Sequence, residues 1–266
     1  MSELLDLAVS IATEAGELAR TRRAQGVSVA ASKSSTEDIV TFADRETEAL
    51  IRRRIKQERP DDGFFGEESG AERGTSGITW VVDPIDGTVN FFYGIPQYAA
   101  SIAVVKGEPD PERWTALAGV VLNPATGELF TATDGGGAFL NARPIRVNTA
   151  VPLDQALVGT GFAYRAEARM VHARIVAELL GQVRDIRRMG SAALDLCAVA
   201  CGRLDAYLER ELSPWDYAAG ALIAREAGAR VSGVPGKAPG REFVMAADPE
   251  LSRALEAALD ALDAFA

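Results

Sequence analysis

The sequence is poor in the residues that define several enzyme classes, with one histidine and two cysteines among 266 residues. A lone His172 excludes catalysis by a pair of histidines, and we expect it at a surface or half-buried helical position. Two cysteines are too few for a disulfide framework. Cys197 and Arg203 fit a Cys-x₅-Arg phosphatase pattern, but Cys197 and Cys201 lie in an apolar helical run. We therefore interpret both as small core residues rather than as a nucleophile.

Long apolar runs and an excess of positive charge are also missing. No run approaches the roughly 18 residues that cross a bilayer, and residues 1–6 lack the basic start and apolar core of a signal peptide. The net charge of −10 argues against a surface that binds nucleic acid. We therefore expect a cytoplasmic protein without a membrane or nucleic-acid partner.

Two signatures of other phosphate-handling proteins are incomplete. Gly135, Gly136 and Gly137 are not followed by the Lys-Ser/Thr pair of a nucleotide P-loop, so we expect a flexible hairpin tip there. An aspartyl-phosphate mechanism would use an Asp-x-Asp spacing, whereas two residues separate Asp83 from Asp86. Neither mechanism is therefore our first interpretation.

What is present is the composition of a globular protein, with 47% apolar and 25% charged residues. Helical periodicity occurs at 3–25 and 41–58, and short strand-like runs follow at 63–66, 78–83, 98–106, 117–122, 128–133 and 138–140. The last third alternates, with strands at 157–161, 183–187, 204–208, 230–232 and 242–246 and helices at 167–180, 191–201, 214–228 and 249–264. Hairpins followed by alternating elements predict an α+β fold with mixed sheets and helical layers.

The most informative segment is an apolar strand that ends in two carboxylates, Asp83 and Asp86. Hard cations such as Mg²⁺ prefer oxygen ligands, and the carbonyl of Ile85 between the two acids could join them. Gly87 and Thr88 follow and offer backbone N–H groups to a phosphate. The simpler alternative is a surface turn, because Asp-Pro and Asp-Gly are common turn pairs.

Further acidic residues lie where a predicted strand ends or a predicted helix begins. Glu67 and Glu68 follow the strand-like run 63–66, and Asp216 follows Trp215 at an expected helix start. A helix N-terminus accommodates any carboxylate, so Asp216 alone could be only a cap. Together, however, these acids would repel one another unless cations were present.

Five segments in this order resemble the inositol monophosphatase family nearly end to end. They are Gly66–Ser69, Asp83–Thr88 and Trp215–Gly220, with weaker matches at Lys33–Asp44 and Gly190–Ala193. The resemblance implies a layered αβαβα sandwich with mixed sheets, forming one domain over residues 1–266. Within it, residues 1–145 would form the metal- and phosphate-binding half and residues 146–266 the substrate-hydroxyl half.

The resemblance also implies an activity: hydrolysis of myo-inositol 1-phosphate, or a similar polyol phosphate, by water that two or three Mg²⁺ ions activate. Glu67, Asp83 and the Ile85 carbonyl would bind the first ion. Asp83, Asp86 and Asp216 would bind the second, and Glu67 would help with a third. Inhibition by lithium and a homodimer are further implications.

The remaining site residues come from the same resemblance. Asp44 and Thr88 would help to orient and deprotonate the attacking water, and Glu67 would be the third catalytic residue. Phosphate would meet the amides of Gly87 and Thr88. The predicted substrate contacts are Asp86, Gly87, Thr88, Gly190, Ser191, Ala192, Glu209 and Asp216.

The substrate itself stays open. Ser191 stands where many relatives have Thr, and Arg210 and Glu211 fall where the family varies. Lys33 is either a solvated surface group or part of a loop that approaches the metal ions. Relatives with these motifs act on histidinol phosphate, fructose 1,6-bisphosphate, NADP or 3′-phosphoadenosine nucleotides. A regulatory binding protein that keeps the fold is the alternative of another class.

Overall fold

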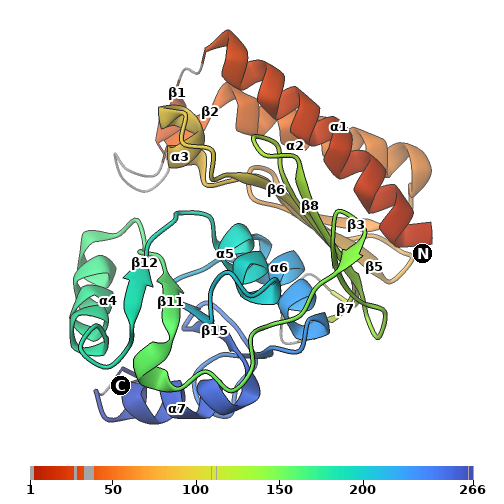
Figure 1. Ribbon diagram of the computed structural model, residues 1–266. Helices are drawn as coiled ribbons and strands as arrows, with labels where there is room; N and C mark the ends of the chain where they lie inside the picture. The colour runs from red at the N-terminus through yellow and green to blue at the C-terminus, as the bar shows by residue number, and fades with distance from the viewer. Residues whose placement is uncertain are drawn as a thin grey trace.

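The fold is an α+β sandwich of five layers, seen in a computed structural model that describes residues 3–26, 29–32, 39–108, 110–111, 113–262 and 264–265. Two sheets alternate with three layers of helices (Figure 1). The fold class inferred from the sequence is therefore confirmed. Among the described residues, no helix combines the length and the apolar character that crossing a membrane requires.

The larger sheet has eight strands in the order β10-β9-β8-β7-β6-β5-β3-β4. All neighbours are antiparallel except β3 and β5, which run parallel. Its strands are β3 (Gly63–Gly66), β4 (Gly70–Glu72), β5 (Ile78–Asp86), β6 (Ala99–Lys106), β7 (Thr115–Asn123), β8 (Glu128–Thr133), β9 (Gly137–Leu140) and β10 (Arg143–Pro144).

The smaller sheet has the order β12-β11-β13-β15-β14, with β11 parallel to both of its neighbours. A separate ribbon pairs β1 with β2. These strands are β1 (Val29–Ser32), β2 (Ile39–Thr41), β11 (Leu157–Thr160), β12 (Asp185–Arg187), β13 (Ala206–Glu209), β14 (Arg230–Ser232) and β15 (Val244–Ala247).

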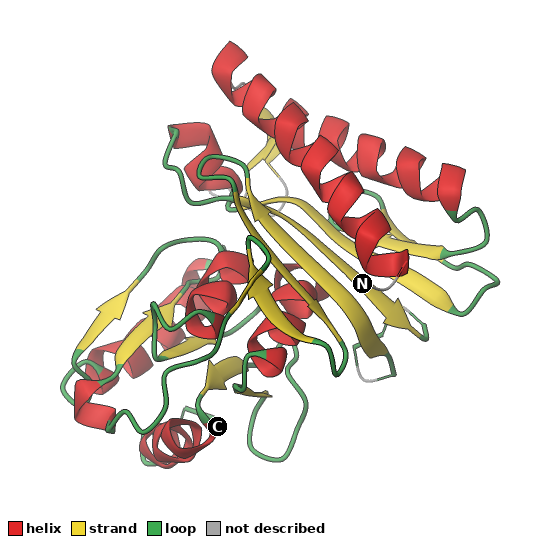
Figure 2. Ribbon diagram, turned by 45° about the vertical axis from the view of Figure 1, so that its right-hand side comes forward, coloured by secondary structure: helices red, strands yellow, loops and turns green. Residues whose placement is uncertain are grey.

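Helices cover both sheets. Figure 2 shows α1 and α2 on the outer face of the larger sheet, and α5 and α6 lie between the two sheets. The third helical layer, α4 and α7, packs on the smaller sheet through a separate apolar cluster. The helices are α1 (Glu3–Gln25), α2 (Phe42–Glu58), α3 (Thr88–Tyr93), α4 (Ala166–Leu179), α5 (Ala192–Ala200), α6 (Pro214–Glu226) and α7 (Pro249–Asp260), with a 3₁₀ turn at Leu153–Gln155.

Strand β5 divides its side chains between two cores. Trp80 and Val82 are buried against α1 and α2, whereas Val81 belongs to the core formed with α5 and α6. Side chains alternate along a strand, so Asp83, two residues after Val81, faces the α5–α6 layer. The end of β5 thereby presents a carboxylate toward the start of α6.

The structure contradicts one expectation about a single residue. His172 is not at the surface or half-buried but is 2% exposed, with its Nε2 2.8 Å from Thr160 Oγ1. Its ring packs edge-on against Phe162. Two preceding apolar residues, Met170 and Val171, are the exposed ones instead, so α4 presents the other face to the core.

Candidate active site

A bulge brings the two aspartates of β5 to one place. In a regular strand, residues three apart point to opposite faces. Here the register with β6 shifts: Asp83 pairs with Ser101 and Asp86 pairs with Ala99, so an advance of three residues along β5 corresponds to two along β6. The strand predicted from the sequence ends at Asp83, whereas β5 continues through the bulge to Asp86. Such a bulge re-aims side chains and leaves backbone groups unpaired.

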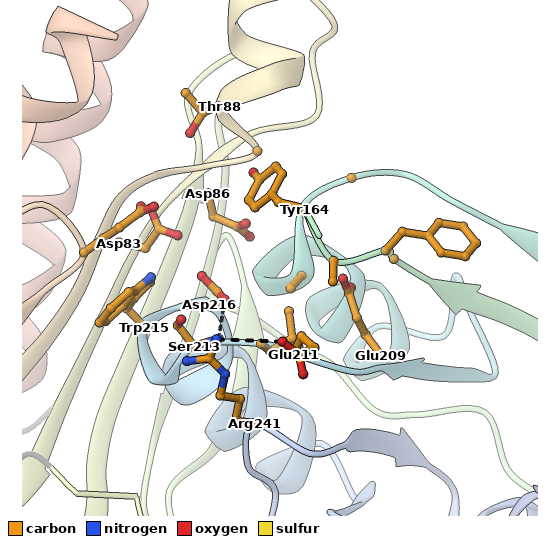
Figure 3. Close-up of a pocket in the computed structure, with 18 of the residues that line it drawn as sticks. Asp83, Asp86, Thr88, Tyr164, Glu209, Glu211, Ser213, Trp215, Asp216 and Arg241 are labelled. Atoms are coloured by element: carbon orange, nitrogen blue, oxygen red, sulfur yellow. Dashed lines mark hydrogen bonds and ion pairs between the residues drawn. The ribbon is translucent and has the colours of Figure 1, made fainter. Parts of the chain in front are cut away.

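Acids from three distant segments line one cavity of about 340 Å³ (Figure 3). Asp83 and Asp86 come from β5, Asp216 from the first turn of α6, and Glu67 from the residue after β3. Figure 3 shows Asp83, Asp86 and Asp216 grouped on one side of the cavity. The structure thus brings together all four acids that the sequence predicts as metal ligands, along with Ile85.

Each aspartate is oriented by hydrogen bonds. The amide of Ile85 donates to Asp83 Oδ1 at 3.0 Å, and the amide of Ser213 donates to Asp216 Oδ2 at 2.6 Å. Asp86 Oδ2 accepts from the hydroxyl of Ser191 at 2.6 Å and from the amide of Ala193 at 2.7 Å. The carboxylates are therefore held in place before any ligand binds.

Burial and mutual repulsion act on these carboxyls in the same direction. Burial first, and then the charges of Glu67, Asp86 and Asp216, raise the pKa of Asp83 well above its ordinary value. Burial likewise raises the pKa of Asp86 to about 6. Burial, followed by Asp86 and Glu67, also raises the pKa of Asp216 well above its ordinary value. Crowded acids without a compensating charge are costly to keep ionised.

The donor set fits a hard divalent cation. It consists of oxygen atoms alone, four carboxylates and the carbonyl of Ile85, and Mg²⁺ prefers such ligands. Within the described part of the chain, no three acidic, histidine or cysteine side chains already lie close enough together to bind one metal ion. Binding would then combine two or three of these side chains with the carbonyl, water and substrate oxygens, as Mg²⁺ commonly does.

A hydroxyl next to the acids is linked to a buried carboxyl. Thr88 Oγ1 lies 3.1 Å from Asp44 Oδ1 and 3.2 Å from the carbonyl oxygen of Ile85. Asp44 does not line the cavity; it caps α2, where the amide of Thr41 donates to its Oδ2 at 2.8 Å. Burial raises the pKa of Asp44 to about 7. Thr88 therefore stands between the cavity and a carboxyl that can take up a proton near neutral pH.

The backbone conformation at position 87 requires glycine. Its φ of 95° lies in the left-handed region, and a Cβ there would come within 2.9 Å of the Gln97 carbonyl and 3.1 Å of the Gly190 carbonyl. Gly87 and Gly190 thus meet where the two halves of the cavity join. Asn90 Nδ2 adds hydrogen bonds to the carbonyls of Gln97 and Met189 at 2.7 and 2.8 Å.

The far side of the cavity holds the predicted hydroxyl-binding groups. Gly190, Ala192 and Glu209 line it, whereas Ser191 is buried beneath it as the N-cap of α5. Glu209 accepts a short hydrogen bond from Tyr207, and burial raises the pKa of Glu209 to about 7. The carboxylate of Glu209 lies so close to Gly161 that any side chain there would collide with it.

Several cavity residues were not predicted from the sequence. Phe162–Arg165 follow β11, so their place at a strand end was visible, but none of them is acidic like Glu67. Arg241 sits in an irregular loop and carries no comparable signal. Of the two variable positions, Glu211 lines the cavity, but Arg210 donates to the carbonyl of Ala264 instead. Part of one family-like segment, residues 33–38 including Lys33, lies outside the described residues.

Comparisons with known proteins identify one family and one fold. The sequence profile of the inositol monophosphatase family matches residues 1–263. Inositol-1-monophosphatase of Mycobacterium leprae is 44% identical over 99% of this chain and 96% of its own. The Nus factor SuhB of Escherichia coli K12 is 42% identical over 89% of this chain and 87% of its own. The extragenic suppressor protein SuhB of Bartonella henselae superposes with a TM-score of 0.89 at 36% identity, covering 97% of this chain and 98% of that one.

Proposed function

The chain belongs to the inositol monophosphatase family, and from that premise we propose that it hydrolyses the phosphate monoester of a small polyol, such as myo-inositol 1-phosphate. The observation that carries the proposal is the meeting of Glu67, Asp83, Asp86 and Asp216 in one cavity, opposite Glu209. The four acids would repel one another without cations, and Glu209 can accept hydrogen bonds from the hydroxyls of a substrate. This arrangement suits a metal-assisted reaction on a sugar-like phosphate.

Magnesium ions are part of the proposal. Glu67, Asp83, Asp86, Asp216 and the Ile85 carbonyl would hold two or three of them. When bound, they would neutralise the phosphate dianion, lower the pKa of a coordinated water and stabilise the departing oxygen. The carboxylates would then be ionised, because a cation reverses the mutual repulsion that otherwise raises their pKa values.

Thr88 and Asp44 supply the proton acceptor. In our proposal, Thr88 Oγ1 orients the attacking water and takes its proton, while the hydroxyl proton of Thr88 passes to Asp44 Oδ1. A base with a pKa of about 7 is well matched to this task. Gly87 and Thr88 would present their backbone amides to the phosphate oxygens.

The second half would recognise the alcohol. Glu209, held by Tyr207, would accept hydrogen bonds from ring hydroxyls, and Gly190 and Ala192 would contact the ring through the backbone. Ser191 serves this side indirectly, through its hydrogen bond to Asp86. Residues 1–145 and 146–266 thus remain our proposal for two functional halves of one domain.

One assay tests the proposal: release of phosphate from a panel of monoesters with Mg²⁺, with a chelator, and with Mg²⁺ plus lithium. We expect turnover of inositol 1-phosphate that Mg²⁺ supports and that both the chelator and lithium suppress. A preference for histidinol phosphate or a nucleotide would move the substrate to another branch of the family. Sedimentation of the purified chain tests the homodimer that we propose with it.

A regulatory role is the second candidate, because one relative is named a Nus factor at 42% identity. The acids of the cavity are all present, which favours retained catalysis, and the two roles are compatible. Absence of turnover on every monoester, by a folded protein supplied with Mg²⁺, would favour the regulatory role over the phosphatase.

A further inference from the structure

A buried glutamate on α2 lies behind the metal-binding acids and has no role in the reaction proposed above. Glu48 is 3% exposed, and its Oε2 accepts a hydrogen bond of 2.8 Å from the amide of Glu68. Glu68 directly follows the proposed metal ligand Glu67. A polar group is costly to bury unless it is hydrogen-bonded, so this contact accounts for the place of Glu48 beside the turn after β3.

Two successive backbone amides fix this turn. The amide of Glu67 donates to the carbonyl of Val82 on β5 at 3.2 Å, and the next amide, that of Glu68, donates to Glu48 on α2. Val82 directly precedes Asp83 in the chain. The first hydrogen bond therefore sets the position of Glu67 relative to the acids of β5, and the second sets it relative to α2.

Helix α2 also contacts the side chain of Glu68. Arg45 Nε lies 3.8 Å from Glu68 Oε2, and the side chain of Glu68 is only 8% exposed. Arg45 and Glu48 are three residues apart, so they are neighbours on one face of the helix. Of the two consecutive glutamates, Glu67 lines the cavity and Glu68 does not. The contacts with α2 thus accompany an orientation in which only Glu67 reaches the other acids.

The residue before these glutamates leaves room for the approach of Glu48. A Cβ built on Gly66 would collide with Glu48 Oε2 and with the ring of Phe64. Any side chain at position 66 would therefore push the carboxylate away from the amide of Glu68. The family-like segment that begins at Gly66 thus contains both a proposed metal ligand and the glycine that the contact with α2 needs.

The same helix carries the proposed proton acceptor. Asp44 and Glu48 are four residues apart on α2, which places them one above the other on one face, and both are buried. Asp44 Oδ1 lies 3.1 Å from Thr88 Oγ1. One turn of α2 therefore connects the group that would take up the proton with the turn that carries Glu67.

We propose that Glu48 is a positioning residue for the Mg²⁺ site: through the amide of Glu68, it holds the turn after β3 so that the carboxylate of Glu67 points into the cavity. Glu48 is not among the residues that line the cavity, so it would touch neither metal nor substrate. Because the turn is fixed beforehand, Mg²⁺ need not order it on binding. The inference rests on the proposed function, in which Glu67 is a ligand of Mg²⁺.

Thermal unfolding of the metal-free chain at increasing concentrations of Mg²⁺ alone measures the dissociation constant of the ion without turnover. Glu48→Met removes the acceptor but keeps a side chain of similar length, and we expect the dissociation constant to rise about tenfold. In the phosphate-release assay, the Mg²⁺ concentration for half-maximal activity should rise by the same factor. The kcat at saturating Mg²⁺ and the KM for inositol 1-phosphate should stay close to the wild-type values.

Glu48→Gln is the conservative variant, because its side-chain oxygen can still accept from the amide of Glu68, and it should restore most of the affinity for Mg²⁺. Gly66→Ala pushes Glu48 off this amide without removing it. This variant should weaken Mg²⁺ binding in the same direction, and it provides a second route to the answer if Glu48→Met does not fold.

Glu226→Met is the matched control. The carboxylate of Glu226 accepts from the amides of Gly135 and Gly137 at 2.9 and 2.8 Å, in the hairpin between β8 and β9. The variant loses contacts of the same kind away from the cavity, so it should lower the unfolding temperature and leave the Mg²⁺ dissociation constant unchanged. Thr47→Val alters the neighbouring buried position of α2, whose hydroxyl has no hydrogen-bond partner within the described part of the chain, and should leave that constant unchanged too.

Glu67→Gln shows whether Glu48 acts through Glu67. The double variant Glu48→Met/Glu67→Gln should bind Mg²⁺ little more weakly than Glu67→Gln alone. Fully additive losses, or a wild-type dissociation constant in folded Glu48→Met, would overturn the positioning role and leave the phosphatase intact.

Failure of the proposed function has a different signature. A wild type that binds Mg²⁺ but hydrolyses no monoester would overturn the phosphatase, and the unfolding experiments would still decide the role of Glu48. A wild type that does not bind Mg²⁺ would overturn both proposals.

Discussion

Ser191 Oγ donates a hydrogen bond of 2.6 Å to Asp86 Oδ2, joining residues that are 105 positions apart in the chain. The same hydroxyl accepts from the amide of Leu194 at 3.3 Å and so caps α5. One small side chain therefore connects the N-terminus of a central helix with a carboxylate of the cavity.

Replacing this hydroxyl should affect both roles. We expect Ser191→Ala to lower the free energy of unfolding by about 1 kcal/mol through the lost cap. It should also raise, several-fold, the Mg²⁺ concentration needed for half-maximal activity, because Asp86 loses the hydrogen bond from the Ser191 hydroxyl. Ser191→Thr keeps the hydroxyl and is the control. An unchanged Mg²⁺ requirement in Ser191→Ala would mean that the hydrogen bond does not orient Asp86 for metal binding.

Asp83→Asn should separate activity from stability. Asp83 would bind both the first and the second Mg²⁺ ion, so its loss should reduce kcat/KM by more than about a hundredfold. The metal-free variant should unfold at the same temperature as wild type or higher, because the repulsion of Asp83 by Glu67, Asp86 and Asp216 disappears. Thermal unfolding of both proteins in the presence of a chelator measures this difference in unfolding temperature. Near-normal turnover by the folded variant would remove Asp83 from the site.

Thr88 and Asp44 should behave as one unit. Thr88→Val should lower kcat about a hundredfold, since the path from the cavity to Asp44 is broken. Asp44→Asn should cost a similar amount, and the double variant should be little worse than either single one. Thr88→Ser, which keeps the hydroxyl, should retain most of the activity. Fully additive losses would show that the two residues act separately.

His172 should make stability fall in mild acid. Burial, and to a smaller extent Arg210, lowers the pKa of His172 from 6.5 to about 4. Above pH 6.5 the ring is neutral in both states and has no effect. Between pH 6.5 and 4 the unfolded chain binds a proton that the folded chain does not, so stability decreases by roughly 3 kcal/mol as the pH falls through this window.

Urea unfolding of wild type and His172→Gln at several pH values measures this contribution. The variant should show a shallower loss between pH 6.5 and 4, although both proteins also lose stability from their other titrating groups. Parallel curves would show that His172 becomes protonated in the folded state without penalty.

The acids proposed as metal ligands were predictable because they lie where a predicted strand ends or a helix begins. Glu67, Asp83 and Asp216 all stand at such junctions, and the layered fold places the junctions together. The resemblance to the family added Asp44, which no local pattern distinguishes from other acids, and Glu209, which directly follows the predicted strand 204–208. The roles proposed for these two acids depend on their hydrogen bonds. Asp44 contacts Thr88, which is distant in the sequence, and Glu209 contacts Tyr207, which is buried in the core.

Other features depended on tertiary contacts that the sequence does not display. Helix α3 has only six residues, and Asn90 within it is tied to the carbonyl of Met189, 99 positions away. The burial of His172 was missed because apolar residues occur on both faces of α4, so periodicity did not indicate the inner one. Arg241 lies in a loop whose conformation depends on Glu211.

The bulge between Asp83 and Asp86 has a consequence for how such a site can be lost. Removing one residue there would restore regular pairing with β6 and, at a spacing of two, still leave both aspartates on one face. The carbonyl now provided by Ile85, whose oxygen lies 3.2 Å from Thr88 Oγ1, would return to the ladder between the strands. A single-codon deletion could thus preserve every acidic residue and still withdraw a main-chain oxygen from the cavity.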